Sequence, residues 1–158
     1  MSYNSKKTIV SMAAGVVIFA AYIIYALGSS SPAIENVKDW AKVMLLFIGI
    51  GIGALIVIQI LFHIGCAIGI AVKEEGKSDK EIERIVSATV IEDEREKMIN
   101  LKSAHIGYIC VGLGFVAVLI ALMMNVAIVS ALHILFGAFG LASIMEGFVS
   151  IYLYERGI

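Results

Sequence analysis

Charge, proline and cysteine are all scarce in this sequence. Only 16% of the 158 residues are charged and 60% are hydrophobic, whereas a soluble domain has about 25% charged and about 45–50% apolar residues. A formal net charge of −1 gives no basic surface for nucleic acid. The two cysteines, Cys66 and Cys110, lie in apolar runs and are typical of small hydrophobic residues rather than of a disulfide framework. This composition predicts an integral membrane protein, with the lipid bilayer as its first partner.

Four stretches are long and apolar enough to cross a membrane, which takes about 20 residues. Residues 28–40 interrupt the first two; they hold the only proline and end at Trp40, which suits a membrane interface. Residues 103–145 carry no Asp, Glu, Lys or Arg and are too long for one crossing. Asn125 is the turn-prone residue near their middle, so we place a turn at 124–127. The predicted spans are residues 8–27, 43–70, 105–123 and 127–152.

A polar segment, residues 73–104, separates the second span from the third. Ser78 and Glu81 form a capping box, and an amphipathic helical pattern follows it. Seven Lys and Arg residues lie in this segment, against two in the first loop and its flank. Because positive charge accumulates on the cytoplasmic side, we expect this segment and both termini to be cytoplasmic in the cell membrane. The predicted fold is all-α: one membrane domain of four transmembrane helices, arranged as two hairpins joined by a cytoplasmic amphipathic helical linker.

The end of this segment carries a recognisable pattern. Asp93-Glu94-Arg95 is followed by Ile99 and then by Lys102-Ser103, directly before the third span. The chain resembles an uncharacterised family of small four-span prokaryotic membrane proteins. These have an acidic-Glu-Arg cluster, a short helical stretch, and a Lys or Arg followed by a small residue before a transmembrane hairpin. The resemblance implies a four-span layout, and the helix-turn-helix regulators encoded beside some members imply a sensing or regulatory setting.

Three polar residues within the apolar stretches are predicted to share one layer near the cytoplasmic interface. A carboxylate such as Glu146 costs at least about 2.5 kcal/mol at the centre of a bilayer. About twenty residues separate Glu146 from the turn, which places it near the inner boundary, and His105 is at the same depth on the third span. His63, counted inward from Trp40, also reaches this level. We expect either an interfacial or paired carboxylate, or a proton or cation site.

Two cofactor alternatives involve the same layer. His63 and Cys66 lie one helical turn apart, so together with His105 and Glu146 they are a candidate transition-metal set. Haem between His63 and His105 is the second alternative. The sequence contains no phosphate loop, nucleotide fingerprint or catalytic triad pattern. We therefore expect no enzymatic activity, no cofactor and no metal.

Glycine is abundant and has helical spacing on the second span. Gly49 and Gly53, and again Gly65 and Gly69, are four residues apart, a pattern that lets membrane helices approach closely. The pattern is compatible with packing inside one chain or with a homodimer face, and a dimer is the favoured oligomer. The preferred hypothesis is a non-enzymatic interaction, sensory or regulatory protein that docks a cytoplasmic or membrane protein partner through residues 73–104, with Asp93, Glu94, Arg95 and Lys102 at the contact. The alternative is a small transporter or ion-conducting oligomer that uses Glu146.

Overall fold

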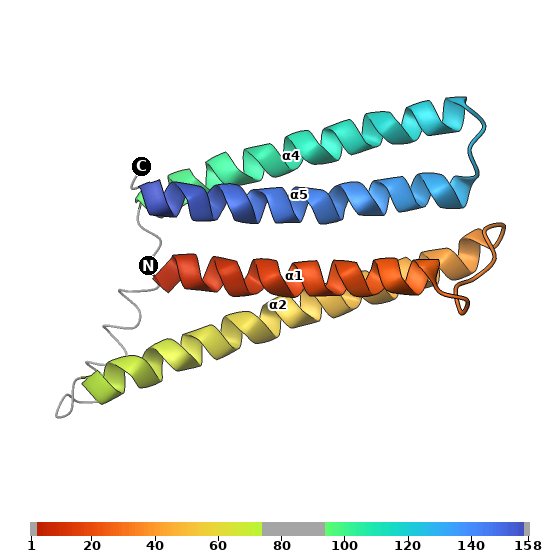
Figure 1. Cartoon of the computed structure of the whole chain (residues 1–158). Helices are drawn as coiled ribbons and strands as arrows, with labels where there is room; N and C mark the ends of the chain where they lie inside the picture. Colours follow the sequence, from red (N-terminus) through yellow and green to blue (C-terminus); the bar gives the residue numbers. More distant parts are fainter. Residues whose placement is uncertain (1–2, 74–93, 157–158) are drawn as a thin grey trace.

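The chain is a bundle of long helices (Figure 1). The structure is a computed structural model that describes residues 3–73 and 94–156. No strand occurs within these two ranges. Their helices are α1 (Tyr3–Leu27), α2 (Val37–Lys73), α4 (Glu94–Met123) and α5 (Ile128–Arg156).

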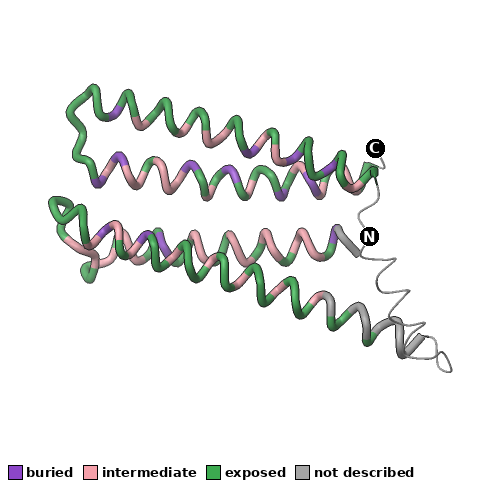
Figure 2. The backbone as a smooth tube through the Cα atoms, turned by 180° about the vertical axis from the view of Figure 1, so that it is seen from behind, coloured by how far each residue is buried: buried purple, intermediate pink, exposed green. Residues whose placement is uncertain are grey.

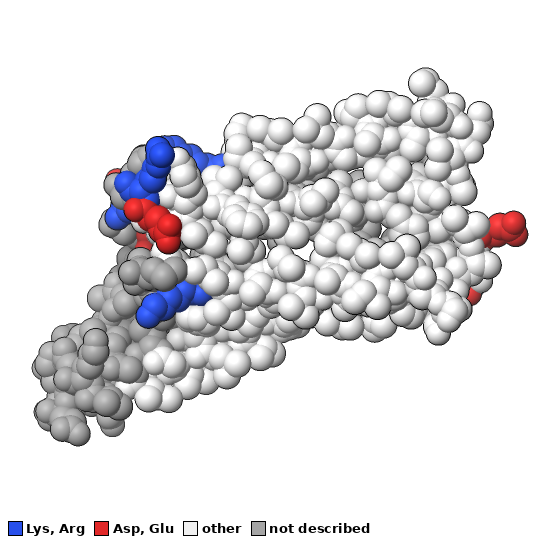
Figure 3. All heavy atoms as spheres, viewed as in Figure 1, with Lys and Arg blue, Asp and Glu red and all other residues white. Residues whose placement is uncertain are grey.

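All four described helices are long and apolar enough to span a membrane. The shortest, α1, has 25 residues and measures about 37 Å, against about 30 Å of hydrocarbon. Charged side chains gather at the two ends of the bundle and are absent from the belt between them on the face that Figure 3 shows. The protein is therefore an all-helical protein of the multi-pass membrane class.

The helices lie side by side in the order α4, α5, α1, α2 (Figure 1). Among the described residues, α4 contacts α5 alone, whereas α5 contacts all three other helices. The 28–36 loop and the 124–127 turn lie at one end, which we call the loop end. At the opposite end, the polar end, α1 and α4 begin and α2 and α5 finish. Toward this end α2 diverges from α1, whereas α4 and α5 come together, so the two pairs of helices open at opposite ends.

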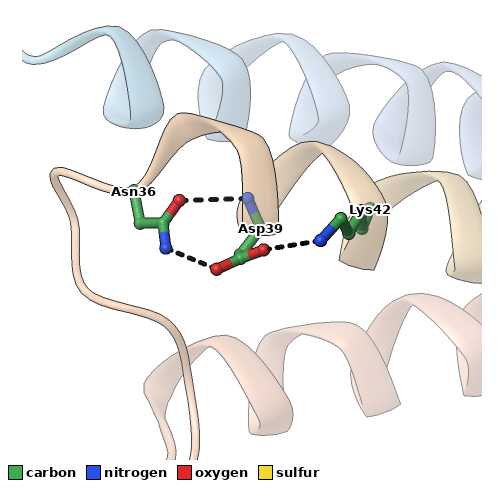
Figure 4. A network of polar contacts seen from close by, with 3 residues as sticks. All are labelled: Asn36, Asp39 and Lys42. Atoms are coloured by element: carbon green, nitrogen blue, oxygen red, sulfur yellow. Dashed lines mark hydrogen bonds and ion pairs between the residues drawn. The ribbon is translucent and has the colours of Figure 1, made fainter.

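The start of α2 differs from the predicted loop at 28–40. The helix begins at Val37 because Asn36 caps it: Asn36 Oδ1 accepts a hydrogen bond from the backbone N–H of Asp39, at 3.3 Å. The Asn36 side-chain amide also donates to the Asp39 carboxylate. Lys42 Nζ then forms an ion pair with Asp39 Oδ1 at 2.9 Å, one helical turn further (Figure 4). This capping pattern places Trp40 within the first turn of α2 rather than in a loop.

The turn between α4 and α5 occupies residues 124–127, where the sequence analysis places it. Asn125 adopts a left-handed backbone conformation with φ 59°. Its N–H donates to the Leu122 carbonyl at 3.0 Å, and the Val126 N–H donates to the Ala121 carbonyl at 3.1 Å. These two bonds form a Schellman motif, which ends a helix at a residue that tolerates positive φ. Asparagine is the commonest substitute for glycine at that position, which explains why Asn125 marks the turn.

The helix of the predicted third span begins well before residue 105, inside the charged segment. Within the described residues, α4 runs unbroken from Glu94 to Met123, so residues 94–104 and the span form one helix. Ser103 is buried against α5, and its hydroxyl donates to the Asn100 carbonyl at 3.1 Å. A small, internally bonded residue at this position lets the two helices meet without an unpaired polar group. The predicted capping box at Ser78 and Glu81 lies outside the described residues.

Small residues form the contact between α4 and α5. A Cβ added at Gly114 would lie 2.1 Å from Ala138 Cβ, so this approach requires glycine. On the other side of α5, a Cβ at Gly140 would meet the Phe19 ring at 2.5 Å. By contrast, a Cβ at Gly49, Gly53 or Gly65 of α2 would meet nothing within 4 Å. Figure 2 shows the same difference, with buried residues concentrated on α4 and α5 and exposed residues along most of α2.

Candidate functional site

The loop end contains an aromatic cluster at the junction of α1, α2 and α5. Tyr22 is its centre: its ring lies 4.1 Å from the Phe136 ring and 5.3 Å from the Phe47 ring, the latter in an edge-on geometry. Such offset and edge-on pairs stabilise a contact beyond the area that they bury. The members of this aromatic cluster are Phe19, Tyr22, Tyr25, Trp40, Phe47, His133 and Phe136.

A buried and a half-buried polar ring meet inside the aromatic cluster. Tyr22 Oη and His133 Nδ1 share a hydrogen bond of 2.6 Å between α1 and α5. Trp40 is only 3% exposed and meets the His133 ring edge-on, with centroids 4.4 Å apart. The sequence predicts Trp40 at the level of a membrane interface, and in the structure its ring is buried between helices at the loop end. The cluster therefore packs three helices together, and His133 has a partner inside it.

The predicted polar layer is only partly assembled in the structure. His105 and Glu146 are both exposed, on the neighbouring helices α4 and α5. His105 lies eighteen residues before Met123, where α4 ends, and Glu146 lies eighteen residues after Ile128, where α5 begins. Each is therefore about 27 Å along its helix from the 124–127 turn. No hydrogen bond or ion pair joins the two side chains within the described part of the chain.

Glu146 faces the backbone of α4 instead. A Cβ added at Gly107 would lie 3.3 Å from Glu146 Oε2, so the carboxylate rests where α4 has no side chain. Gly107 is buried, and its missing side chain leaves room for Glu146 beside the helix contact. The arrangement places one carboxylate at the surface of the apolar belt, close to the polar end. This carboxylate is neither bonded to His105 nor sealed inside the bundle.

An apolar groove of about 520 Å³ lies between α4 and α5 near the polar end. Its walls include Leu101 and Ile106 of α4 and Val149 and Leu153 of α5. Two polar residues, Lys102 and His105, line it one turn apart on α4. Neither has a hydrogen-bond or ion-pair partner among the residues that the structure describes. Within the described residues, this groove thus combines an apolar lining with polar groups that have no partner.

The residues of the predicted contact motif lie at the same end. Glu94, Arg95 and Lys102 are exposed on the first turns of α4, and Glu94 and Arg95 take part in polar interactions. Asp93 lies outside the described residues. The motif is thus part of the helix that continues into the apolar belt, and Lys102 is the member that also lines the groove.

Only part of the candidate metal set lies among the side chains that the structure describes. The side chains of His63 and Cys66 lie outside the described residues. Among the side chains that are described, no group of three or more His, Cys, Asp or Glu residues is close enough to hold a metal ion. His105 and Glu146 alone provide too few ligands for a protein-bound transition metal.

Sequence reasoning missed the aromatic cluster. Tyr22, Trp40 and His133 each lie within about one and a half turns of a helix end at the loops, so counting depth would have placed them at one level. Depth does not say which helix faces meet, however, and that information comes from the packing.

Comparisons with protein-family models, with curated proteins and with solved structures gave no match.

Proposed function

We propose that this chain is a non-enzymatic membrane protein with a sensory or regulatory role, whose polar end is its contact surface. The observation that supports this proposal is the continuity of α4. This helix has 30 residues, and it includes both the exposed charged turns that start at Glu94 and the apolar turns that follow them. A partner that binds the charged turns therefore acts directly on the helix that packs against α5.

The proposed arrangement in the membrane is two hairpins, α1–α2 and α4–α5, with the polar end in the cytoplasm. The excess of Lys and Arg at the polar end supports this orientation. An impermeant maleimide tests it, in a background where Cys66 and Cys110 are replaced by alanine. We expect Ser29→Cys to be labelled in intact cells and Lys97→Cys only after lysis. The reverse pattern would overturn the orientation.

A photocrosslinking experiment tests the contact surface itself. A benzophenone amino acid replaces Lys97, which is exposed on the second turn of α4, and, as a control, Leu113, which is exposed in the apolar belt. We expect a discrete protein adduct from position 97 and lipid adducts alone from position 113. The adduct at 97 should disappear when Glu94→Lys and Arg95→Glu exchange the local charges. Identical products from both positions would contradict the proposal.

We also propose that a second copy packs on α2. The open space around Gly49, Gly53 and Gly65 supports this, because these glycines serve no close contact within the described chain. Light scattering of the detergent-solubilised protein should give the mass of a dimer, and Gly53→Ile should convert it to a monomer. Gly112→Ile is the matched control, because a Cβ at Gly112 of α4 also meets nothing within 4 Å. A wild-type monomer, or equal effects of both substitutions, would refute an α2 interface.

The exposed carboxylate of Glu146 supports an alternative function, a small transporter or ion-conducting oligomer. A charged group at the surface of an apolar belt is costly unless water or another subunit covers it. Purified protein in liposomes with an internal pH dye should then carry protons or cations, and Glu146→Gln should abolish the flux. An absence of flux in the wild type removes this alternative.

Metal content and an absorbance spectrum of the same preparation test the metal and haem hypotheses.

A further inference from the structure

We propose that the groove between α4 and α5 binds one anionic phospholipid. The groove combines an apolar lining with two polar groups at one end, the chemistry of a lipid's acyl chain and its headgroup. It opens on the outer surface of the α4–α5 pair, where α4 has no other helix beside it among the described residues. An acyl chain can therefore enter it sideways from the bilayer.

The depth of the polar groups matches that of a phospholipid headgroup. Lys102 is twenty-one residues before Met123, about 32 Å along α4 and just beyond about 30 Å of hydrocarbon. His105 is about 4.5 Å deeper. The ammonium of Lys102 is therefore at the level of the lipid phosphate, and the imidazole N–H of His105 is at the level of the glycerol esters. Leu101, Ile106, Val149 and Leu153 provide the apolar wall.

The charges around the groove favour an anionic lipid over a zwitterionic one. Lys102 has no carboxylate partner among the described residues, so its positive charge is available to a phosphate. The acidic residues of α5 closest in sequence to the groove lining are Glu146, three residues before Val149, and Glu155, two residues after Leu153. The Glu146 carboxylate lies against Gly107, deeper than Lys102. An anionic headgroup is thus attracted toward Lys102 and repelled from the interior, which fixes its position at the boundary.

Native mass spectrometry of the full chain in detergent tests this proposal. The protein is titrated with phosphatidylglycerol and, in parallel, with phosphatidylcholine of the same acyl chains. We expect one phosphatidylglycerol to bind at least about fivefold more tightly, because one basic residue near an anionic headgroup contributes about that factor. Lys102→Gln should remove the preference, and Lys102→Arg should keep it.

Lys97→Gln is the matched control, because Lys97 is also exposed on α4 but does not line the groove. It should change binding less than twofold. Val149→Trp, which fills the groove, should weaken the binding of both lipids, whereas inorganic phosphate should not compete with either. Equal binding of the two lipids, equal effects of the two lysine substitutions, or competition by inorganic phosphate would each overturn the proposal.

Discussion

At the loop end, His133 is half-buried, bonded to Tyr22 of α1 and packed against Trp40 of α2, whereas at the polar end His105 lies exposed on α4 beside α5. The difference comes from how many helices meet. Where three helices meet, Tyr22 and His133 bond to each other and the Trp40 ring is buried, although its Nε1 has no hydrogen-bond partner among the described residues. Where only α4 and α5 meet, His105 and Lys102 stay exposed, and their side chains are available for a ligand. The loop end therefore packs α1, α2 and α5 together, and the polar end carries the candidate site.

The largest expected effect is at Trp40. Trp40→Ala removes a ring that is only 3% exposed, so it should lower the free energy of unfolding by about 3 kcal/mol. A titration with a denaturing detergent, followed by circular dichroism, measures the loss. His105→Ala at the polar end is the control and should change stability by less than about 0.5 kcal/mol. Equal losses at both positions would remove the distinction between the two ends.

The next effect is at the contact that holds α4 beside α5. Gly114→Ala places a Cβ about where Ala138 Cβ already is, so the helices must separate, at a cost of about 1–3 kcal/mol. Gly112→Ala adds the same methyl group where nothing lies within 4 Å and should cost nothing. The same unfolding titration compares the two variants. If Gly114→Ala proves as stable as Gly112→Ala, the close approach of α4 and α5 is wrong.

A smaller effect is expected from the hydrogen bond inside the aromatic cluster. Tyr22→Phe removes the bond to His133 and keeps the ring contacts, so it should cost about 0.6–1 kcal/mol. Tyr108→Phe is the control, because Tyr108 is 75% exposed on α4. Double substitution of Tyr22 and His133 by phenylalanine should cost less than the sum of the two single changes. Strict additivity would show that the bond contributes nothing.

The smallest effect, with the opposite sign, is expected at Glu146. Glu146→Gln removes a charge from the apolar belt without breaking any hydrogen bond among the described residues, so stability should stay equal or rise by up to about 1 kcal/mol. Thermal unfolding in detergent gives the sign. A loss of more than about 1 kcal/mol would mean that the carboxylate is paired after all, and the polar end would then resemble the loop end.

Helix type and helix number within the described chain followed directly from the sequence, because long apolar runs have few other ways to satisfy their backbone in lipid. The turn at Asn125 was also predictable, since it is the residue there that tolerates positive φ. The predicted loop at 28–40 ends too late, because Asn36 caps the helix at Val37 and the Asp39 carboxylate accepts from the Asn36 amide. The sequence predicted a helical segment up to residue 104 and a span from residue 105, and only the structure shows that residues 94–123 are one unbroken helix. Glu, Arg and Lys are all good helix formers, so the charged turns continue into the apolar ones.

Composition and the spacing of polar residues determined the class of this protein and the depth of each residue along its helix. Depth put His105 and Glu146 at one level, and Tyr22, Trp40 and His133 at another. Only the tertiary structure decided which of these residues touch, since helix rotation depends on the small residues that allow close approach, such as Gly114 and Gly140. Those contacts turn His133 inward to Tyr22 and leave His105 and Lys102 in an open groove.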